Sequence, residues 1–308
     1  MTHGVFVLNK PLGMTSQQAV TRVKRILHAR KAGHTGTLDP NVTGVLPILL
    51  GSATRLSEYV MESEKAYLAT AWLGFSTDTQ DHTGRVLEVA DASHLSDEEI
   101  RDALDSFLGV TSQTPPIYSA VHVAGRRAHE LARAGHTVVL EARETVIHEI
   151  MLHGITRRAD AILVNFSLRC GKGTYVRTLC NDLGVKLGVP AHMFELTRTK
   201  SGPFTLDDAH SFDELENGLT DLVRSAEDAV PALQKLTVAK NALQTIVHGA
   251  PLFLADAFVA DQGVIFQDEC IVGIRVCSEL VALYRAHEKD GDVWRLTAHK
   301  VLAQQEVE

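Results

Sequence analysis

The sequence predicts an α+β protein with a large mixed or antiparallel sheet, followed by a small β-rich second domain. Strand-like and helix-like segments mix along most of the chain, without the regular alternation that builds a parallel sheet. Near Pro231 the order changes to short strand-like segments. A length of 308 residues and a hydrophobic content of 45% suit one large or two ordinary globular domains. We therefore expect domains at 1–232 and 233–308.

The first elements follow from the spacing of apolar residues. Gly4–Asn9 is a short apolar strand, and Thr15–Ala29 is a helix that Ser16 can cap. The apolar face of this helix carries Val20, Val23, Ile26 and Leu27. After a glycine-rich loop, the continuous apolar run Val45–Leu50 indicates a buried strand, and Lys65–Leu73 alternates like a strand.

The middle of the chain adds further helices and strands. Ser96–Leu108 is an amphipathic helix with a capping box from Ser96 to Glu99. The segments that follow are predicted strands at Ala120–Val123 and Thr137–Leu152 with a helix at Arg126–Ala134 between them, then a strand at Ala161–Cys170, a helix at Thr174–Leu187 and an extended stretch at His192–Thr199.

The second domain is predicted from a run of short strands. After Pro231, a connector and one helix precede these strands. They are expected at Val264–Phe266, Ile271–Val276, Leu280–His287 and Val293–Leu302. About 70 residues lie within the usual range for a small domain.

Composition and motifs exclude several classes of protein. No apolar run approaches the roughly 20 residues that span a bilayer, and the start of the chain does not resemble a secretory signal, so a cytoplasmic protein is expected. The four cysteines form no C-x-x-C pair and no H-E-x-x-H pattern occurs, so we expect no metal. The phosphate-binding pattern G-x-x-x-x-G-K-[ST] and the G-x-G-x-x-G fingerprint are both missing, so we expect no nucleotide or other cofactor.

The net charge of −8 hides an alternation along the chain. Residues 1–60 and 111–202 each carry a net charge of +5, whereas 61–110 carry −8 and 203–308 carry −10. A polyanion could bind a face built from the two basic segments, because the local field matters more than the net charge. Ordinary surface unevenness is the alternative interpretation.

One stiff loop, AGHTGTLDPNVTG, holds a lone carboxylate, Asp39. Gly33 and Gly36 permit unusual backbone angles or the close approach of a ligand. Pro40 biases Asp39 towards an extended conformation, and Val45–Leu50 would anchor the loop to the core. Such a loop preorganises a carboxylate for work as a nucleophile or base, although Asp39 could simply cap a turn.

A second acidic loop, STDTQDHTG, contains Asp78 and Asp81. Threonine, aspartate and glycine directly after a strand are typical of turns, so both acids are interpreted as turn-building side chains.

The loop around Asp39, G-H-T-G-T-L-D-P-x-x-T-G-V-L, resembles the catalytic motif of pseudouridine synthases, the TruB type in particular. Further segments resemble motifs of the same family in the same order, over most of residues 4–204. They are NKPLGMTS (Asn9–Ser16), KAYLATAWLGFSTDTQDHTG (Lys65–Gly84), PPIYSAVHVAGRRAHELARAG (Pro115–Gly135), GKGTYVRTLCNDLG (Gly171–Gly184) and LTRTKSGPF (Leu196–Phe204).

This resemblance implies a fold and an activity. The fold is a mixed, largely antiparallel sheet flanked by helices, with an RNA-binding insertion near 85–140 and a small PUA-like C-terminal domain, which is acidic here and is not expected to hold RNA strongly. The activity is isomerisation of uridine 55 in the T loop of tRNA, on a flipped-out base, without guide RNA. A monomer that contacts the T arm is expected. The alternative is an RNA-binding protein that helps tRNA fold and in which catalysis is secondary.

The resemblance also implies a role for each site residue. Asp39 would be the nucleophile and Arg177 its cationic partner. Tyr67 would stack on the flipped base. The pocket would be lined by Tyr175 and Leu196, the space vacated by the base would be filled by His34, and a phosphate would be contacted by Lys10.

Overall fold

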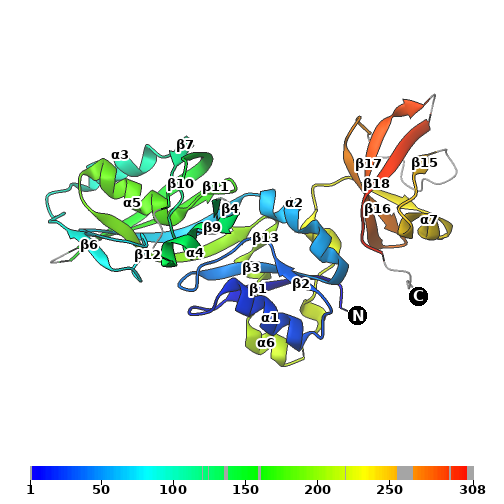
Figure 1. Ribbon diagram of the computed structural model, residues 1–308, viewed down its shortest axis with the longest axis horizontal. Helices are drawn as coiled ribbons and strands as arrows, with labels where there is room; N and C mark the ends of the chain where they lie inside the picture. Colours follow the sequence, from blue (N-terminus) through cyan, green and yellow to red (C-terminus); the bar gives the residue numbers. More distant parts are fainter. Residues whose placement is uncertain are drawn as a thin grey trace.

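We describe a computed structural model of the chain. It describes residues 2–119, 121–123, 125–134, 138–158, 161–218, 220–254, 266–290 and 293–303. The molecule is elongated, with a large sheet that extends from one end to the centre and a separate C-terminal sheet at the other end (Figure 1).

The large sheet is mixed and mainly antiparallel. Its strands lie in the order β1-β3-β12-β4-β11-β10-β7, with β2 paired to β3 and β13 paired to β12. The β3–β12 pair is parallel and the other pairs of this sheet are antiparallel, which confirms the predicted sheet. The strands are β1 (Gly4–Lys10), β2 (Ala32–His34), β3 (Thr43–Leu50), β4 (Lys65–Leu73), β7 (Gly109–Gln113), β10 (Arg143–Arg157), β11 (Ile162–Cys170), β12 (Ala191–Ser201) and β13 (Phe204–Thr205).

Three of the predicted helices contact this sheet. α1 (Ser16–Ile26) is capped by Thr15, not by Ser16 as expected, because Thr15 accepts a hydrogen bond from the backbone N–H of Gln18. α3 (Asp97–Asp105) has the predicted capping box, and α5 (Val176–Leu187) ends at a left-handed Gly188. The others are η1 (Gly51–Leu56), α2 (Ser57–Glu62), α4 (Ala128–Arg133), η2 (Leu206–Asp208), α6 (Phe212–Glu216), η3 (Thr220–Leu222), η4 (Ala226–Ala229), η5 (Lys240–Ala242) and α7 (Leu243–Val247).

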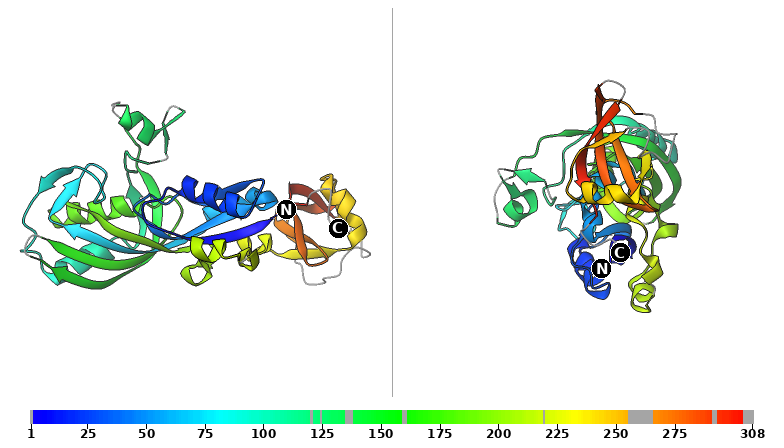
Figure 2. Two further views of the ribbon diagram at one scale, coloured as in Figure 1. Left: turned by 90° about the horizontal axis from the view of Figure 1, so that it is seen from below. Right: turned by 90° about the vertical axis from the view of Figure 1, so that its right-hand side faces the viewer.

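The segment between β4 and β11 differs most from the prediction. β7 was not predicted, and the strand expected at Thr137–Leu152 is β10, which begins and ends later in the chain. β5 (Phe75–Thr77) and β6 (Val86–Val89) form a hairpin that was also missed. β8 (His122–Val123), β9 (Arg126–Arg127) and α4 project from the sheet as an arm (Figure 2). β8 and α4 lie within the predicted strand Ala120–Val123 and helix Arg126–Ala134. β7 is mostly polar, and β5 and β9 have only three and two residues, so they carry too little apolar periodicity for the sequence pattern to reveal them.

β1 and β3 are buried on both faces, which explains their continuous apolar runs. Alternate side chains of a strand point to opposite faces, so Phe6 and Leu8 join the core beneath α1 while Val5 and Val7 join a second core. That second core also contains apolar residues of the C-terminal sheet and its connector: Ala229, Val230, Leu280, Leu283 and Leu302. The connector and a few residues of the C-terminal sheet therefore pack against the second face of β1 and β3.

The C-terminal sheet has the strand order β14-β16-β17-β18-β15. Its strands are β14 (Lys235–Val238), β15 (Leu252–Leu254), β16 (Ile271–Val276), β17 (Glu279–Asp290) and β18 (Val293–Val301). β14 lies in the segment that was interpreted as a connector, so that interpretation was wrong there. The predicted strand Val264–Phe266 lies, except for Phe266, outside the described residues.

Candidate active site

The Asp39 loop is held at several points along its backbone. Thr35 donates its N–H to the carbonyl of Pro47 at 3.2 Å, which ties the loop to β3. Ser16 is buried and its hydroxyl both donates to the carbonyl of Leu38 at 2.9 Å and accepts from the N–H of Leu38 at 2.8 Å. Ser16, which does not cap α1, thus fixes Leu38, the residue directly before Asp39.

Arg177 on α5 forms an ion pair with Asp39. Its Nε lies 3.0 Å from the Asp39 Oδ2, and the arginine side chain is only 7% exposed. The two terminal nitrogens donate to main-chain oxygens, Nη1 to Thr79 at 3.1 Å and Nη2 to Tyr118 at 2.9 Å. Because these bonds orient the guanidinium, the carboxylate of Asp39 faces a fixed positive charge.

Asp81 adds a second carboxylate to this arrangement. Its Oδ2 lies 3.8 Å from Nη1 of Arg177, and its side chain is 5% exposed. Asp81 also accepts hydrogen bonds from the hydroxyl of Thr79 and from the N–H and hydroxyl of Thr83. The interpretation of Asp81 as a turn-building side chain was therefore incomplete, since the same side chain contacts the partner of Asp39.

Burial is the main influence on the Asp39 carboxyl group and raises its pKa above the ordinary value. Arg177 opposes this effect, Asp81 adds to it, and Lys10 lowers the pKa slightly. The pKa of Asp81 lies below its ordinary value: its burial works in the opposite direction, and the hydrogen bonds from Thr83 and Thr79, with the charge of Arg177, outweigh it. The pair of carboxyl groups is thus asymmetric, and Asp39 is the more basic of the two.

A cavity of about 590 Å³ opens in front of Asp39. It is lined by residues of the Asp39 loop, β4, α5 and β12, among them Asp39, Tyr67, Tyr175, Arg177, Leu196 and Arg198. The structure therefore brings together five of the seven residues that the sequence analysis selected. The volume lies in the range typical of pockets for small ligands.

Arg198 is a residue of this cavity that the sequence analysis did not select. It is 2% exposed, and it donates from Nε to the carbonyl of Val45 at 2.8 Å and from Nη2 to the carbonyl of Gly36 at 3.0 Å. Its guanidinium also interacts with the Tyr67 hydroxyl and opposes the rise in the pKa of Tyr67 that burial causes. Arg198 thus connects the Asp39 loop to the aromatic side of the cavity.

His34, within the Asp39 loop, and Lys10, at the end of β1, are not among the described residues that line the cavity. His34 ends β2, its Nδ1 accepts from the N–H of Gly36 at 3.3 Å, and burial, with Arg198, lowers its pKa. Lys10 is fully buried, and its ammonium donates to the carbonyls of Pro11, Met14 and Pro40. Burial lowers the pKa of Lys10 to about 8. In this geometry the Lys10 ammonium is bonded to the Asp39 loop. The sequence analysis expected it to contact a phosphate of the RNA instead.

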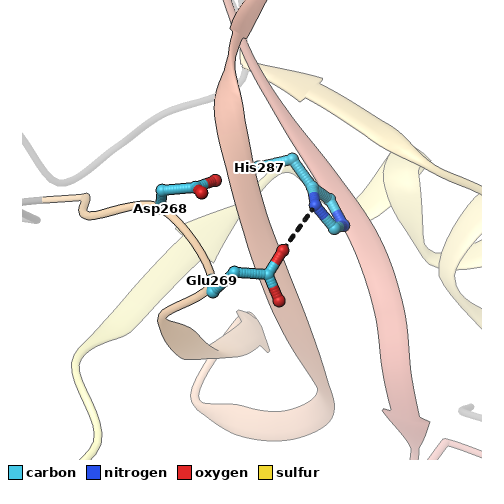
Figure 3. A group of neighbouring side chains, drawn as sticks. All are labelled: Asp268, Glu269 and His287. Atoms are coloured by element: carbon cyan, nitrogen blue, oxygen red, sulfur yellow. Dashed lines mark ion pairs between the residues drawn. The ribbon is translucent and has the colours of Figure 1, made fainter.

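One group of potential metal ligands occurs in the described part of the chain, far from this cavity in the C-terminal sheet. It consists of Asp268, Glu269 and His287 (Figure 3). Glu269 pairs with Arg285 at 2.6 Å and with His287 at 3.1 Å. Both interactions orient the Glu269 carboxylate. Among the described helices, none is long and apolar enough to cross a membrane.

Comparison with known families identifies the relatives of this chain. Residues 24–176 match the family model "TruB family pseudouridylate synthase (N terminal domain)", and residues 177–238 match "tRNA pseudouridylate synthase B C-terminal domain". The sequence is 42% identical over 302 residues to tRNA pseudouridine synthase B of Bacillus velezensis, covering 93% of this chain and 94% of the relative. It is 44% identical over 253 residues to the protein of that name from Geobacter sulfurreducens, covering 80% and 82%.

Solved structures agree with this placement. A structure of an H/ACA RNP bound to a substrate RNA containing 2′-deoxyuridine matches with a TM-score of 0.72 at 27% identity, over 99% of this chain and 86% of that one. A Cbf5-Nop10-Gar1 complex matches with a TM-score of 0.70 at 29% identity, over 98% and 85%. From the matched family models and the extent of identity to its relatives, this chain belongs to the TruB family of pseudouridine synthases.

Proposed function

We propose that this pseudouridine synthase isomerises uridine 55 in the T loop of tRNA, with Asp39 as the nucleophile. The observation that carries the proposal is the Asp39–Arg177 ion pair, at 3.0 Å, in the lining of a cavity of about 590 Å³. The substrate class follows from the relatives, which are named tRNA pseudouridine synthase B.

The reaction breaks the N1–C1′ bond of uridine, turns the uracil and joins C5 to C1′. The proton on C5 is lost and N1 gains one, so no redox step or energy input is needed. Attack of Asp39 on C1′, attack on C6, and assistance to elimination all require an ionised carboxylate near the ribose. Arg177 serves each route, because its charge favours the ionised form of a carboxyl group whose pKa burial raises.

The cavity suits a nucleotide that has left the RNA stack. Tyr67 and Tyr175 offer aromatic surface, and Leu196 offers an apolar wall. A flipped base is held by stacking and by contacts to its edge, so we assign Tyr67 to stacking and Tyr175 and Leu196 to the walls. His34 would occupy the space that the base leaves; its lowered pKa keeps the ring neutral near pH 7, as suits stacking within RNA.

Lys10 and Arg198 act through the loop in this proposal. Lys10 donates to the carbonyl of Pro40, which follows Asp39 directly, and Arg198 donates to the carbonyl of Gly36. Holding the loop on both sides of Asp39 fixes where its carboxylate points. Both are therefore positioning residues.

The test is release of tritium from tRNA labelled at C5 of uridine. The wild-type protein should release one equivalent, and Asp39→Asn should release none while binding tRNA with wild-type affinity. Asp105→Asn is a matched control, because Asp105 lies exposed on α3, and it should behave as wild type. Turnover by Asp39→Asn near the wild-type rate would show that the nucleophile is misassigned.

The same experiment addresses the alternative of a protein that mainly helps tRNA fold. RNA folding does not need an ionised Asp39, so Asp39→Asn would retain a folding activity in full.

We expect that the protein acts without guide RNA, since the curated relatives are bacterial. We also expect a cytoplasmic monomer. Light scattering on the protein alone and with tRNA measures the oligomeric state.

A further inference from the structure

A second cavity lies where the loop after α1 and the helix η1 meet the end of β18. Its volume is about 380 Å³. It is lined by Thr2, His3, Arg30, Lys31, Gly51, Ser52, Thr54, Arg55, Leu302 and Ala303. Two separate parts of the chain thus build it, the large sheet with its helices and the last residues of the C-terminal sheet.

The charges around this cavity are of one sign. Arg30, Lys31 and Arg55 are all exposed, and the described residues that line the cavity include no acid. In the described part of the chain, Arg30 and Lys31 take part in no ion pair, whereas Arg22 pairs with Glu216 and Arg224 with Asp208. Three like charges around one hollow repel one another, and this arrangement favours an anion.

Hydrogen-bonding groups complete the lining. The hydroxyl of Ser52 and its N–H both face Nδ1 of His3, at 3.4 Å and 3.3 Å. Arg55 bridges the two parts of the chain, because its Nη1 donates to the carbonyl of Val301. Cationic forks and hydroxyls are the groups that proteins use to contact phosphate oxygens of nucleic acids.

The strand β3 connects this cavity to the active site. Val42, directly before β3, lines the cavity of Asp39, and Gly51, directly after β3, lines the second cavity. A strand of eight residues rises about 3.3 Å per residue, so the two sites lie roughly 25 Å apart. A ligand that occupies both sites must therefore span about this distance, as a nucleic acid larger than a single hairpin loop can.

Resting on the proposed function, we propose that this seam cavity binds a backbone phosphate of the tRNA outside its T arm. The cations come from the large-sheet part of the chain, and the C-terminal part contributes the uncharged wall of Leu302 and Ala303. An acidic C-terminal domain therefore helps to build an RNA contact without supplying its charge. In Figure 2, left view, α1 lies on the same side of the large sheet as the arm that carries α4, so one RNA can cover both.

The test compares two substrates, full-length tRNA and an isolated T-arm hairpin that is too short to span the two sites. The variant is Arg30→Gln combined with Lys31→Gln. The matched control is Arg101→Gln combined with Lys240→Gln, which removes the same charge from two exposed residues outside the cavity. Affinity is measured against salt concentration for both RNAs, and turnover is measured by tritium release.

For full-length tRNA, the seam variant should weaken binding roughly tenfold and reduce the slope of log affinity against log salt by about one to two. For the hairpin, its affinity and turnover should match those of the wild type. The control variant should behave as wild type on both RNAs.

Three results would overturn the proposal: equal loss on both RNAs, equal loss in the control variant, or no loss on full-length tRNA. A wild-type protein that releases no tritium from either RNA would instead refute the proposed function.

Discussion

Replacing Arg177 by methionine should move the acid limb of the pH–rate profile to higher pH. The guanidinium lies 3.0 Å from the Asp39 carboxylate and is the main group that lowers the pKa of Asp39. Without it, burial and the nearby Asp81 both raise this pKa unopposed, apart from a small effect of Lys10. Catalysis by an ionised Asp39 would then need a lower proton concentration.

The expected size follows from the geometry. An opposite charge within hydrogen-bonding distance shifts a carboxyl pKa by about one to three units. The Asp39 side chain is 37% exposed, so solvent screens part of the effect and we expect about one unit. Below the limb, one unit corresponds to a tenfold lower rate. Above the limb, any remaining loss reflects the lost orientation of the carboxylate and should not depend on pH.

The assay is single-turnover tritium release from about pH 5 to about pH 9, the range in which a perturbed carboxyl group titrates. Arg177→Lys keeps the charge and should show a smaller shift. Arg169→Met removes another arginine paired to a carboxylate, Glu64 at 3.0 Å, outside the cavity, and should leave the limb in place. An Arg177→Met enzyme with an unshifted acid limb would refute the proposed electrostatic role of Arg177.

Asp81→Asn should shift the limb in the opposite direction, to lower pH, because Asp81 raises the pKa of Asp39; its turnover should also fall, since Arg177 loses a partner, and a limb that moves up would contradict the assignment. Gly44→Ala should cost at least about 2 kcal/mol of unfolding free energy, because Gly44 has a φ of 104° and a Cβ there would lie 2.2 Å from a backbone oxygen of β12. Gly33→Ala, where nothing lies within 4 Å, is the control, and denaturant unfolding that gives equal losses for both would exclude the steric explanation. A chain that ends at residue 232 should aggregate, because the second core loses its C-terminal members. A stable monomer in light scattering would mean that the contacts of the second core with the C-terminal sheet do not stabilise the protein.

Tertiary contact decided which side chains complete the site around Asp39. Asp81 has the local surroundings of a turn residue, and only the packing of α5 against its loop brings it within 3.8 Å of Arg177. No local signal distinguishes it from Asp78. Arg198 did leave a signal: it lies two residues after Leu196 on one strand, and residues at that spacing share a face. The period of two along β12 thus predicts that both line the same cavity.

Burial decided the role of Lys10. A lysine in a proline-containing loop of a basic segment suggests a surface contact with phosphate, but the fold encloses it and supplies three carbonyls as its partners. The sequence shows that the residue is basic, whereas the distance of its ammonium from water depends on elements far along the chain. The same holds for the seam cavity, whose cations lie near the start of the chain and whose wall ends at Ala303.

The sequence by itself determined the sheet class and the rigid Asp39 loop, because these depend on local chemistry, and the family resemblance supplied the candidate pocket residues on β4, α5 and β12. Glycine and proline limit the backbone, alternation sets the faces of strands, and contiguous motifs carry the family resemblance. The tertiary structure alone decided what packs on the second face of β1 and β3, how Asp81 and Arg198 join the site, and how Arg30, Lys31 and Arg55 come to surround one cavity. Those features depend on contacts between residues distant in sequence. The free energy of such contacts comes from apolar surface that two segments bury together, and the sequence of one segment does not show which other segment will cover it.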